Sequence, residues 1–587
     1  MPLMNESTTP PDEIMSASQT LRRWPLAILL AIIVAVPYLP GLIDGPSMLI
    51  MVAGFMGPAA VGLLVLVWWL LASRASGKEK VLGFFGVLVI GAVAMAFLHK
   101  SMQGMGAIAN VVPVGILAFG VPLLIFAASP RYRLPVALAC AVVGFGYWDL
   151  IQSNGVTGRF KGDLDWRWNK TPEELYLEEI ALKGMGNPVE RLSDVSPITL
   201  ASAQWPSFRG PYRDGRQPGV TFDEDWEQSP PKQIWKTKIG PGWSSFSVAG
   251  DRLFTQEQRG DNEAVLCMNA KTGETLWVFE YPGRFWESVA GAGPRATPTI
   301  ADEGLFALGA DGMLACLSPI NGDVVWKTDL KKDANRKPPT WGFSSSPLVI
   351  AGLVLVHAGG KDDKGILAFD AGTGSLRWSA PSGDHSYSSP HLATFAGVRG
   401  VLMETNQGLQ FLNAESGESI WNYDWPIENY RAVQPLVIGD TVMIASTLGE
   451  GMRRLKIAHE GKTWQVTEDW SSRGLKPDFN DFVEHKGFVY GFDADIFTAI
   501  DAETGERKWK RGRYGNGQVV LLPDADQLLI ASETGEIVLV KADPEKLVEL
   551  GKVPAISGKT WNHPVVIGQR VYLRNAEEAA CFEIGSP

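Results

Sequence analysis

Two patterns of hydrophobic residues divide the chain into an apolar N-terminal part and a longer part in which apolar and polar residues alternate. Five apolar stretches contain no charged residue: about 24–43, 48–73, 81–98, 105–128 and 134–148. Each approaches the ~20 residues that a helix needs to cross the hydrocarbon core of a membrane. The pattern predicts five transmembrane helices within residues 24–150, after a tail of residues 1–23.

The first stretch has a second interpretation, because Arg22 and Arg23 precede it as in a secretory signal. Four further apolar runs favour a membrane domain with several spans. No Asp, Glu, Lys or Arg lies inside a predicted span, and a transporter is therefore disfavoured, since ion and proton paths usually need such groups.

The positions of the cations predict how these helices are oriented, because Lys and Arg are retained on the cytoplasmic side. Lys100 falls on one side, and seven cations fall on the other: Arg22, Arg23, Arg74, Lys78, Lys80, Arg131 and Arg133. With an odd number of spans, residues 1–23 are expected in the cytoplasm and everything after about residue 150 outside it. The predicted localisation is the inner membrane, with the soluble part in the periplasm if the cell has an outer membrane.

Residues 151–204 form a polar linker with one predicted helix. Thr171-Pro172-Glu173-Glu174 is a capping box with Pro at the first helical position, and Gly184 is expected to end the helix. Upstream, Asp165-Trp166-Arg167-Trp168 lies just outside the last predicted span. This segment predicts an aromatic belt at the membrane interface, with a quinone or lipid contact as the alternative.

From residue 205 onward, alternating residues predict strands, and a repeated turn places Gly four residues before Trp. The five clean copies contain Gly273, Gly322, Gly374, Gly417 and Gly505, followed by Trp277, Trp326, Trp378, Trp421 and Trp509. Gly is expected to adopt the left-handed conformation of a hairpin turn, and Trp to fill the space between neighbouring sheets. Weaker copies at Trp235, Trp470 and Leu547 complete eight units.

The spacing of these units, 39 to 52 residues, matches a four-stranded propeller blade. Residues 233–239 form a strand without earlier partners, and residues 561–584 contain three strands without a fourth. Pairing them completes the eighth blade. The predicted fold is an all-β eight-bladed β-propeller over residues 205–587, preceded by an α-helical membrane domain of five transmembrane helices.

These repeats resemble the quinoprotein alcohol dehydrogenase-like, or PQQ-like, β-propeller family, whose turn has the pattern Asp-Ala-x-Thr-Gly-Glu-x-x-Trp. The resemblance covers about residues 205–584. Three segments are similar to uncharacterised bacterial PQQ-like repeat proteins: Trp205-Pro206-Ser207-Phe208-Arg209-Gly210-Pro211, Arg295-Ala296-Thr297-Pro298 and Lys559-Thr560-Trp561.

Two further branches of this family imply different functions. The lipoprotein subunit of the outer-membrane β-barrel assembly machine is a binding scaffold with eight such blades, and it lacks a five-span anchor. The membrane-bound quinoprotein glucose dehydrogenase joins five N-terminal spans to an eight-bladed propeller that holds PQQ and a divalent cation. The layout of this chain is similar to that of the second branch.

The loops that enter the innermost strand of each blade are expected to face the central channel, whose mouth is the candidate ligand site. They carry aromatic, cationic and amide residues: Trp243, Arg295, Trp341, His385, Tyr387, Arg431, Asn480, Asp481, Asn516, Trp561 and His563. Such a mouth suits an anionic aromatic ligand or a peptide strand. The alternative for each residue is a solvated or structurally hydrogen-bonded loop position.

PQQ enzymes need an apolar sandwich for the quinone, oxygen ligands for Ca²⁺, a carboxylate base and cations for the PQQ carboxylates. This propeller of about 380 residues lacks the long inter-blade excursions of a dehydrogenase and the vicinal Cys pair of the alcohol dehydrogenase branch. Asp493 and Asp495 precede a strand with no following Glu ligand, so no metal site is predicted.

The leading hypothesis is therefore a binding or scaffold module for a protein or small ligand, with no cofactor assigned. The alternative is a membrane-bound PQQ-dependent dehydrogenase with Ca²⁺ or Mg²⁺, which oxidises sugars or alcohols and passes electrons to quinone.

Charge excludes one class of partner. Residues 1–150 carry 8 Lys/Arg and 6 Asp/Glu, so residues 151–587 carry 45 basic and 58 acidic residues. Such a surface repels phosphate backbones, and nucleic acid is not an expected partner. Three of the four Cys lie just before repeat turns and are predicted to be buried thiols: Cys267, Cys316 and Cys581.

Overall fold

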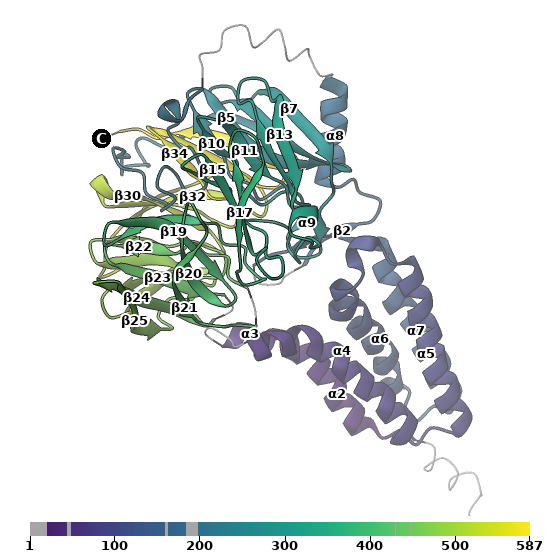
Figure 1. Ribbon diagram of the computed structural model, residues 1–587. Coiled ribbons are helices and arrows are strands. Elements are labelled where there is room, and N and C mark those ends of the chain that lie inside the picture. Colours follow the sequence, from purple (N-terminus) through teal and green to yellow (C-terminus); the bar gives the residue numbers. More distant parts are fainter. Residues whose placement is uncertain are drawn as a thin grey trace, which may run out of the picture. The chain divides into compact units, whose positions relative to one another are not determined.

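The chain divides into two compact units, Met1–Asn169 and Lys170–Pro587 (Figure 1). The structure is a computed structural model that describes residues 20–43, 48–158, 162–183, 198–428, 430–447 and 449–586. Two positions used in the sequence analysis, Gly184 and Pro587, lie outside the described residues.

The first unit holds a bundle of apolar helices: α2 (Arg23–Ala35), α3 (Leu39–Leu42), α4 (Met48–Leu71), α5 (Gly77–Phe97), α6 (Val112–Ile125) and α7 (Pro130–Gly146). Four helical segments are long and apolar enough to cross a membrane: Val52–Leu71, Gly77–Phe97, Ala107–Ile125 and Pro130–Leu150. Only 17–44% of the most apolar window of each is buried inside the unit. The remaining apolar surface faces outward, which suits contact with lipid.

The first predicted span differs from the expectation, because its apolar helix covers only Arg23–Tyr38. Pro37 lies in a 3₁₀ turn after α2, and Pro40 lies in the short helix α3. Proline lacks an N–H and clashes with the preceding turn, so the regular helix ends at Ala35. The 13 residues of α2 extend about 20 Å, less than the ~30 Å hydrocarbon core. The prediction of five full spans is corrected to four, plus one shorter apolar helix.

The N-terminal end of α2 lies at the end of the bundle where the cations gather. The N–H of Leu21 donates to Ala127 O (3.1 Å), and the N–H of Arg22 donates to Ser73 O (3.3 Å). Arg133 forms an ion pair with Glu79 at 2.6 Å between the first turns of α7 and α5. All of these groups belong to one end of the bundle.

A hairpin of β1 (Ile151–Val156) and β2 (Gly162–Trp166) follows α7 and was not predicted. After it, Trp166 and Trp168 stack with ring centroids 4.9 Å apart, and they are 41% and 65% exposed. The Arg167 guanidinium between them donates to Phe97 O (3.0 Å) and Asp149 O (3.3 Å). These bonds hold the exposed indoles at the end of the bundle where α5 and α7 finish.

The second unit contains eight antiparallel four-stranded blades. Blade 1 consists of β4 (Ser247–Ala249), β5 (Arg252–Arg259), β6 (Asn262–Asn269) and β7 (Thr275–Pro282), and blade 2 of β10 (Thr299–Ala301), β11 (Gly304–Leu308), β12 (Met313–Leu317) and β13 (Val324–Asp329). Blade 3 consists of β14 (Leu348–Ile350), β15 (Leu353–His357), β16 (Ile366–Asp370) and β17 (Leu376–Ala380), and blade 4 of β18 (His391–Phe395), β19 (Val398–Thr405), β20 (Gly408–Asn413) and β21 (Ser419–Asp424).

The order is innermost strand first in every blade. Blade 5 consists of β22 (Leu436–Ile438), β23 (Thr441–Ser446), β24 (Gly451–Glu460) and β25 (Thr463–Ser472), and blade 6 of β26 (Val483–His485), β27 (Phe488–Asp493), β28 (Ile496–Asp501) and β29 (Arg507–Arg513). Blade 7 consists of β30 (Gln518–Leu522), β31 (Gln527–Ala531), β32 (Glu536–Lys541) and β33 (Val548–Pro554), and blade 8 of β34 (Val565–Ile567), β35 (Arg570–Arg574), β36 (Glu578–Glu583) and β3 (Lys232–Lys238). A short pair, β8 (Trp286–Glu287) and β9 (Gly291–Ala292), and a helix, α9 (Leu330–Asp333), lie in loops between blades.

Blade 8 is assembled from both ends of the unit, as the sequence predicts. β3 pairs antiparallel with β36, and Trp235 lies opposite Cys581. On β35, the buried Arg574 side chain donates to Gln256 O (2.7 Å) and Gly240 O (3.0 Å), which bonds blade 8 to blade 1. Cys267, Cys316 and Cys581 are buried free thiols, which confirms their predicted role.

The repeat tryptophans dock onto the turn of the following blade. Six indole N–H groups donate to carbonyls of the next blade at 2.8–3.3 Å, from Trp235, Trp277, Trp326, Trp378, Trp470 and Trp509. The five turn glycines have φ of +70° to +79°, and a Cβ on any of them would lie 2.4–2.8 Å from the docked residues. Glycine is thus needed both for its backbone conformation and for the space that the indole occupies.

A belt of hydrogen bonds joins the innermost strands. In seven blades one side chain of the belt stands two residues before the inner strand: Ser245, Thr297, Ser346, Ser389, Gln434, Asp481 and His563. In blade 7 the corresponding side chain is Gln518, the first residue of β30. Six of their backbone N–H groups donate to the belt side chain of the next blade at 2.8–3.3 Å, with the Gln434 amide oxygen facing Ser389. The Gln518 amide reaches Trp561 O (3.2 Å), and Ser245 Oγ reaches His563 O (2.6 Å). The belt therefore closes around the ring.

The predicted linker helix is α8 (Pro172–Lys183). Thr171 Oγ1 accepts from the N–H of Glu174 (3.2 Å), and the Glu174 carboxylate accepts from the N–H of Thr171 (2.8 Å). This reciprocal pair is the capping box that the sequence predicts.

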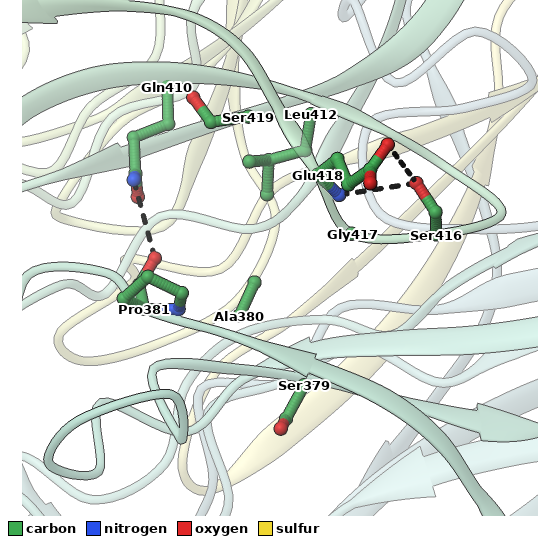
Figure 2. A pocket seen from close by; sticks show the side chains of 9 residues that line it. All are labelled: Ser379, Ala380, Pro381, Gln410, Leu412, Ser416, Gly417, Glu418 and Ser419. Atoms are coloured by element: carbon green, nitrogen blue, oxygen red, sulfur yellow. Dashed lines mark hydrogen bonds between the residues drawn. The ribbon is translucent and has the colours of Figure 1, made fainter.

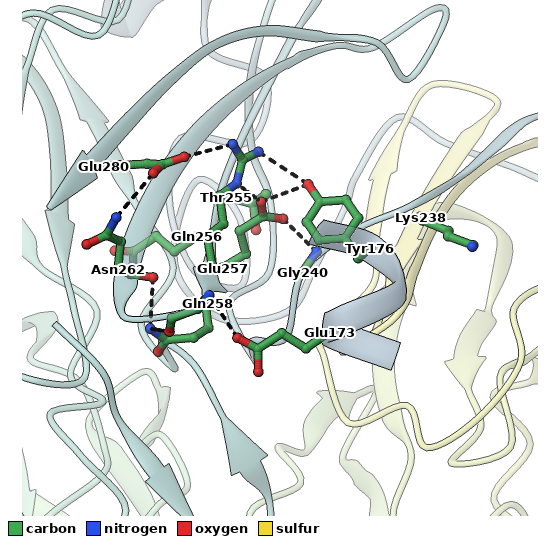
Figure 3. A network of polar contacts seen from close by, with 12 residues as sticks. Glu173, Tyr176, Lys238, Gly240, Thr255, Gln256, Glu257, Gln258, Asn262 and Glu280 are labelled. Carbon is green, nitrogen blue, oxygen red and sulfur yellow. Dashed lines mark hydrogen bonds and ion pairs between the residues drawn. The ribbon is translucent and has the colours of Figure 1, made fainter. Parts of the chain in front are cut away.

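A buried polar network docks α8 on blade 1 (Figure 3). The hydroxyl of Tyr176 donates to the fully buried Glu257 carboxylate at 2.8 Å, and Arg259 donates to the same oxygen at 2.5 Å. One helical turn before Tyr176, the Glu173 carboxylate accepts two bonds from Arg284, at 2.9 and 3.0 Å. Burial of a charge is costly unless it is paired, so these contacts fix α8 in one position on the propeller.

We expect Gly374→Ala to destabilise the propeller more than Gly352→Ala in the same blade. Both glycines have φ near +72°, so each substitution carries the left-handed strain of about 1–2 kcal/mol. A Cβ at Gly374 would lie 2.5 Å from Trp326, whereas one at Gly352 would meet nothing within 4 Å. Overpacking should add about 1–3 kcal/mol at Gly374 alone.

Thermal unfolding of the full chain, followed by near-ultraviolet circular dichroism, measures this difference, with Gly352→Ala as the matched control. Equal losses of stability in the two variants would contradict the docking of Trp326 on this turn.

Candidate binding site at the channel mouth

The segment 205–217 crosses the centre of the ring. Trp205 exchanges backbone hydrogen bonds with Val248 in blade 1 (3.2 and 2.7 Å), and the N–H of Ile300 in blade 2 donates to Pro206 O (2.8 Å). The N–H of Gln217 donates to Leu521 O in blade 7 (2.8 Å). Its side chains also reach Phe482, just before blade 6, and Ser346, just before blade 3. Blades 2 and 6 stand opposite each other in an eight-membered ring, so the segment lies across the channel between the inner strands.

Two buried arginines of this segment reach the hydrogen-bonded belt. Arg209 donates to Phe482 O (2.9 Å) and pairs with Asp481 at 3.4 Å. Arg213 donates to Ser346 O (3.0 Å) and Pro347 O (2.9 Å). Burial, aided by the charge of Arg209, lowers the pKa of Arg213 to about 9. The sequence singled out residues 205–211 only as a family resemblance, and nothing in the motif indicated that they fill the channel.

The first aromatic group at the mouth brings together three predicted residues and one that the sequence missed. Trp341 and Tyr387 lie 5.3 Å apart, and His385 lies 6.1 Å from Tyr387, measured between ring centroids. Tyr430 completes the group, 4.2 Å from Trp341 and 5.4 Å from Tyr387. No motif around Tyr430 indicated from the sequence that it belongs to this group.

An acidic side chain lies beside this group. The Tyr430 hydroxyl donates to Asp478 at 3.4 Å. Burial raises the pKa of Asp478 to about 6, although the hydrogen bond from Tyr430 lowers it. Burial also raises the pKa of Tyr387 above its usual value and the pKa of Tyr430 well above it, so both remain protonated donors at neutral pH.

A second aromatic group stands around Trp561. Its ring lies 5.0 Å from Trp243 and 4.9 Å from Phe479, which the sequence missed. The Lys559 ammonium lies over both indoles, 4.5 Å from the centroid of Trp561 and 5.2 Å from that of Trp243. The Trp561 N–H donates to Glu533 at 3.0 Å. This group combines half-buried aromatic surface with the Glu533 carboxylate and the Lys559 ammonium.

The two predicted arginines do not converge on a ligand position. Arg431 is fully buried, pairs with the fully buried Glu404 at 3.2 Å and donates to Trp425 O at 2.7 Å. Arg295 pairs with Glu287 at 3.0 Å, with its guanidinium 4.6 Å from the Phe285 centroid. Each guanidinium is thus held by a carboxylate of the chain itself.

The remaining candidates make structural bonds between blades or within one. The Asn480 amide donates to Gly517 O (2.7 Å), and Asp481 accepts from the N–H of Gln434 (2.8 Å). The N–H of Asn516 donates to Glu533 at 3.2 Å. His563 is buried in the belt, and burial lowers its pKa to about 3. These residues shape the loops at the mouth and do not project from it.

The residues at the mouth do not fit PQQ. In both aromatic groups the rings already touch one another at 4.2–5.4 Å, so no further ring fits between them. Arg295 and Arg431 are occupied by Glu287 and Glu404 and do not face a ligand carboxylate. In the described part of the chain, no three His, Cys, Asp or Glu side chains are grouped to hold a metal ion.

A small cavity of about 230 Å³ lies elsewhere, between β17 and the β20–β21 hairpin (Figure 2). Its walls are Ser379, Ala380, Pro381, Gln410, Leu412, Ser416, Gly417, Glu418 and Ser419. It is smaller than the ~300 Å³ at which ligand pockets begin, and it includes none of the mouth residues. Gly417 is the turn on which Trp378 docks, so the cavity is a consequence of how blades 3 and 4 pack.

The repeats have known relatives. Residues 225–335 and 263–511 match the family model described as outer membrane protein assembly factor BamB. A protein of that name from Burkholderia pseudomallei is 26% identical over 303 residues, 49% of this chain and 71% of the relative. One from Yersinia pestis is 23% identical over 280 residues, 45% of this chain and 68% of the relative.

Two solved structures are similar to parts of this chain. BamB from Moraxella catarrhalis covers 60% of this chain and 98% of its own, with 14% identity and a TM-score of 0.42. The quinohemoprotein alcohol dehydrogenase from Comamonas testosteroni covers 68% of this chain and 85% of its own, with 12% identity and a TM-score of 0.46. The match of the family model to the blades identifies the repeats of the propeller as PQQ-like.

We expect Arg431→Met to destabilise the propeller by about 3–5 kcal/mol, because it leaves Glu404 buried without its partner. The double variant Arg431→Met/Glu404→Gln should recover at least half of that loss. Thermal unfolding of the full chain measures both. A single variant as stable as the wild type would contradict the structural role of Arg431 and restore it as a ligand-binding candidate.

Proposed function

We propose that this PQQ-like β-propeller repeat protein is a membrane-anchored binding module, whose propeller stands outside the cytoplasm and holds a protein partner at the channel mouth. The proposal rests on the side chains that line the mouth and on the segment that crosses the channel. Half-buried aromatic rings line the mouth, its arginines are neutralised within the chain, and residues 205–217 fill the channel behind it. Such a surface suits a partner that lies across it better than a cofactor that enters it.

The aromatic composition of the mouth also favours a protein partner. Trp and Tyr are enriched in protein interfaces, because they provide a large contact area at a small cost in conformational entropy. Trp286, in the loop before blade 2, adds an indole that is 43% exposed. The curated relatives are outer membrane protein assembly factors, and this similarity supports a partner that is itself a protein.

The proposed orientation follows from the loops between the spanning helices. Arg74 lies between α4 and α5, Lys78 and Lys80 lie in the first turn of α5, and Arg131 and Arg133 lie at the start of α7. Lys100 lies at the opposite end, between α5 and α6. The positive-inside rule then places the C-terminal end of α7 outside the cytoplasm, whether or not α2 crosses the membrane fully. The inner membrane and the periplasm remain the proposed location.

We expect alkaline phosphatase fused after Pro587 to be active in a Gram-negative host, because this enzyme needs the oxidising periplasm. Fusion after Arg74 should be inactive, and fusion after Lys100 should be active. Phosphatase activity normalised to the amount of fusion protein measures the orientation. An inactive fusion after Pro587 with an active fusion after Arg74 would reverse it.

We expect a photoreactive phenylalanine at Trp341 or Trp561 to crosslink a protein partner in cells. The same group at Leu376, which is 51% exposed on the outer strand β17, should give no such product and serves as the matched control. Mass spectrometry of the purified adducts identifies the partner and the crosslinked position.

Two outcomes would contradict this function. One is an identical adduct pattern from all three positions. The other is stoichiometric binding of PQQ by the purified chain in the presence of Ca²⁺ or Mg²⁺, together with dye reduction by sugars or alcohols, which would support the dehydrogenase alternative.

A further inference from the structure

The outermost strand of blade 6 is unusually basic. β29 (Arg507–Arg513) contains five Lys or Arg residues and no acid: Arg507, Lys508, Lys510, Arg511 and Arg513. The seven other outer strands carry net charges from −2 on β25 to +3 on β3. This strand therefore stands out in a chain whose net charge is −11.

A buried carboxylate beneath β29 concentrates further positive charge. Asp493 is fully buried, and one of its oxygens lies 3.0 Å from Lys476, 2.8 Å from Arg507 and 3.0 Å from Lys510. Three cations thus share one carboxylate, and Arg513 at the end of the strand pairs with Asp495 at 3.2 Å. Cations gathered in this way attract an anionic group more strongly than isolated surface cations do.

The backbone of β29 explains why these cations converge. The register between β28 and β29 shifts where Ile500 lies opposite Arg507 and Ala499 lies opposite Trp509. The extra residue is Lys508, so Arg507 and Lys510 lie on the same face of the sheet, opposite to Trp509. Trp509 faces the other way and docks on Asp543 of blade 7.

The outer edge of β29 is open. β29 is the last strand in the order of its sheet and pairs with β28 alone among the described strands. The strand extends about 23 Å. Its register against β28 shifts at two places, and the outward N–H and C=O groups between and beside these shifts can pair with a further strand.

Protection against aggregation does not account for this composition. Charged residues on edge strands do prevent pairing between identical edges. The other outer strands achieve the same with net charges between −2 and +3, however, so this function does not require five cations in seven residues. A basic edge repels a second copy of itself and attracts an acidic strand.

We infer that the edge of blade 6 binds an extended acidic segment of another polypeptide, which adds as a fifth strand beside β29. Main-chain hydrogen bonds to the open edge would hold the segment, and its Asp or Glu side chains would meet the exposed cations of β29. The inference deepens the proposed function by naming one class of partner. It concerns a surface other than the mouth, so each can fail without the other.

The test uses the full chain in phosphatidylcholine nanodiscs and a fluorescein-labelled twelve-residue peptide of alternating Thr and Glu. Its controls are an alternating Thr–Gln peptide and a Thr–Glu peptide N-methylated along one edge. Lys508→Glu/Arg511→Glu reverses two exposed cations of β29, and Lys232→Glu/Arg377→Glu makes the same change in net charge on β3 and β17. Fluorescence anisotropy measures binding, and thermal unfolding checks that each variant is folded.

We expect the Thr–Glu peptide to bind the wild type, and the β29 variant to bind it about tenfold more weakly or less. The control variant should stay within about twofold of the wild type, and the other two peptides should bind weakly.

Equal losses in the two variants, or equal binding of the N-methylated peptide, would overturn the inference, and so would the absence of binding to the wild type. Binding of phosphatidylglycerol vesicles that depends on Lys508 and Arg511, without binding of the peptide, would identify a lipid surface instead. None of these outcomes bears on the crosslinks from Trp341 and Trp561, which test the mouth.

Discussion

The propeller depends on the contact that each blade makes with the next. On the outside of the ring, an indole docks on the following glycine turn, and on the inside, a polar side chain accepts the N–H of the preceding blade. Both contacts join neighbours only, so a linear array of blades would leave the end groups of both series without partners. Closure through β3 and β36 satisfies them, and this explains why the last blade takes one strand from the start of the domain.

The polar belt also decides what the centre of the molecule can do. Buried donors and acceptors around the channel must be satisfied, and residues 205–217 bring Arg209 and Arg213 to do this for carbonyls at the ends of the inner strands. Arg431 is likewise used within the chain, where it pairs with Glu404 and donates to Trp425 O. Polar residues that the sequence offers as ligand contacts therefore bond to other parts of the propeller. The aromatic rings are the side chains that stay available for contact at the mouth.

Features that arise from local repetition could be predicted from the sequence. The left-handed glycines, the interlocking tryptophans, the buried cysteines and the capping box of α8 each follow from a short pattern. Pairings between distant segments could not be predicted. Glu404 and Arg431 are partners across two strands and a loop, and the segment near Arg213 gives no sign of where its chain runs. The helix breaks at Pro37 and Pro40 could have been expected, because proline lacks an N–H, but the apolar pattern continues through them.

The distribution of charge separates two kinds of surface on one propeller. At the mouth, Arg295 and Arg431 meet acids of the chain itself, so the proposed recognition there would rest on aromatic area and on shape. β29 contains five cations and no acid, so attraction at a distance would guide the proposed acidic partner before contact is made. A module with both proposed surfaces would select a partner by charge at the edge of blade 6 and hold it by packing at the mouth. Salt should therefore weaken contacts at the edge more than those at the mouth, since exposed charges are screened and buried aromatic contacts are not.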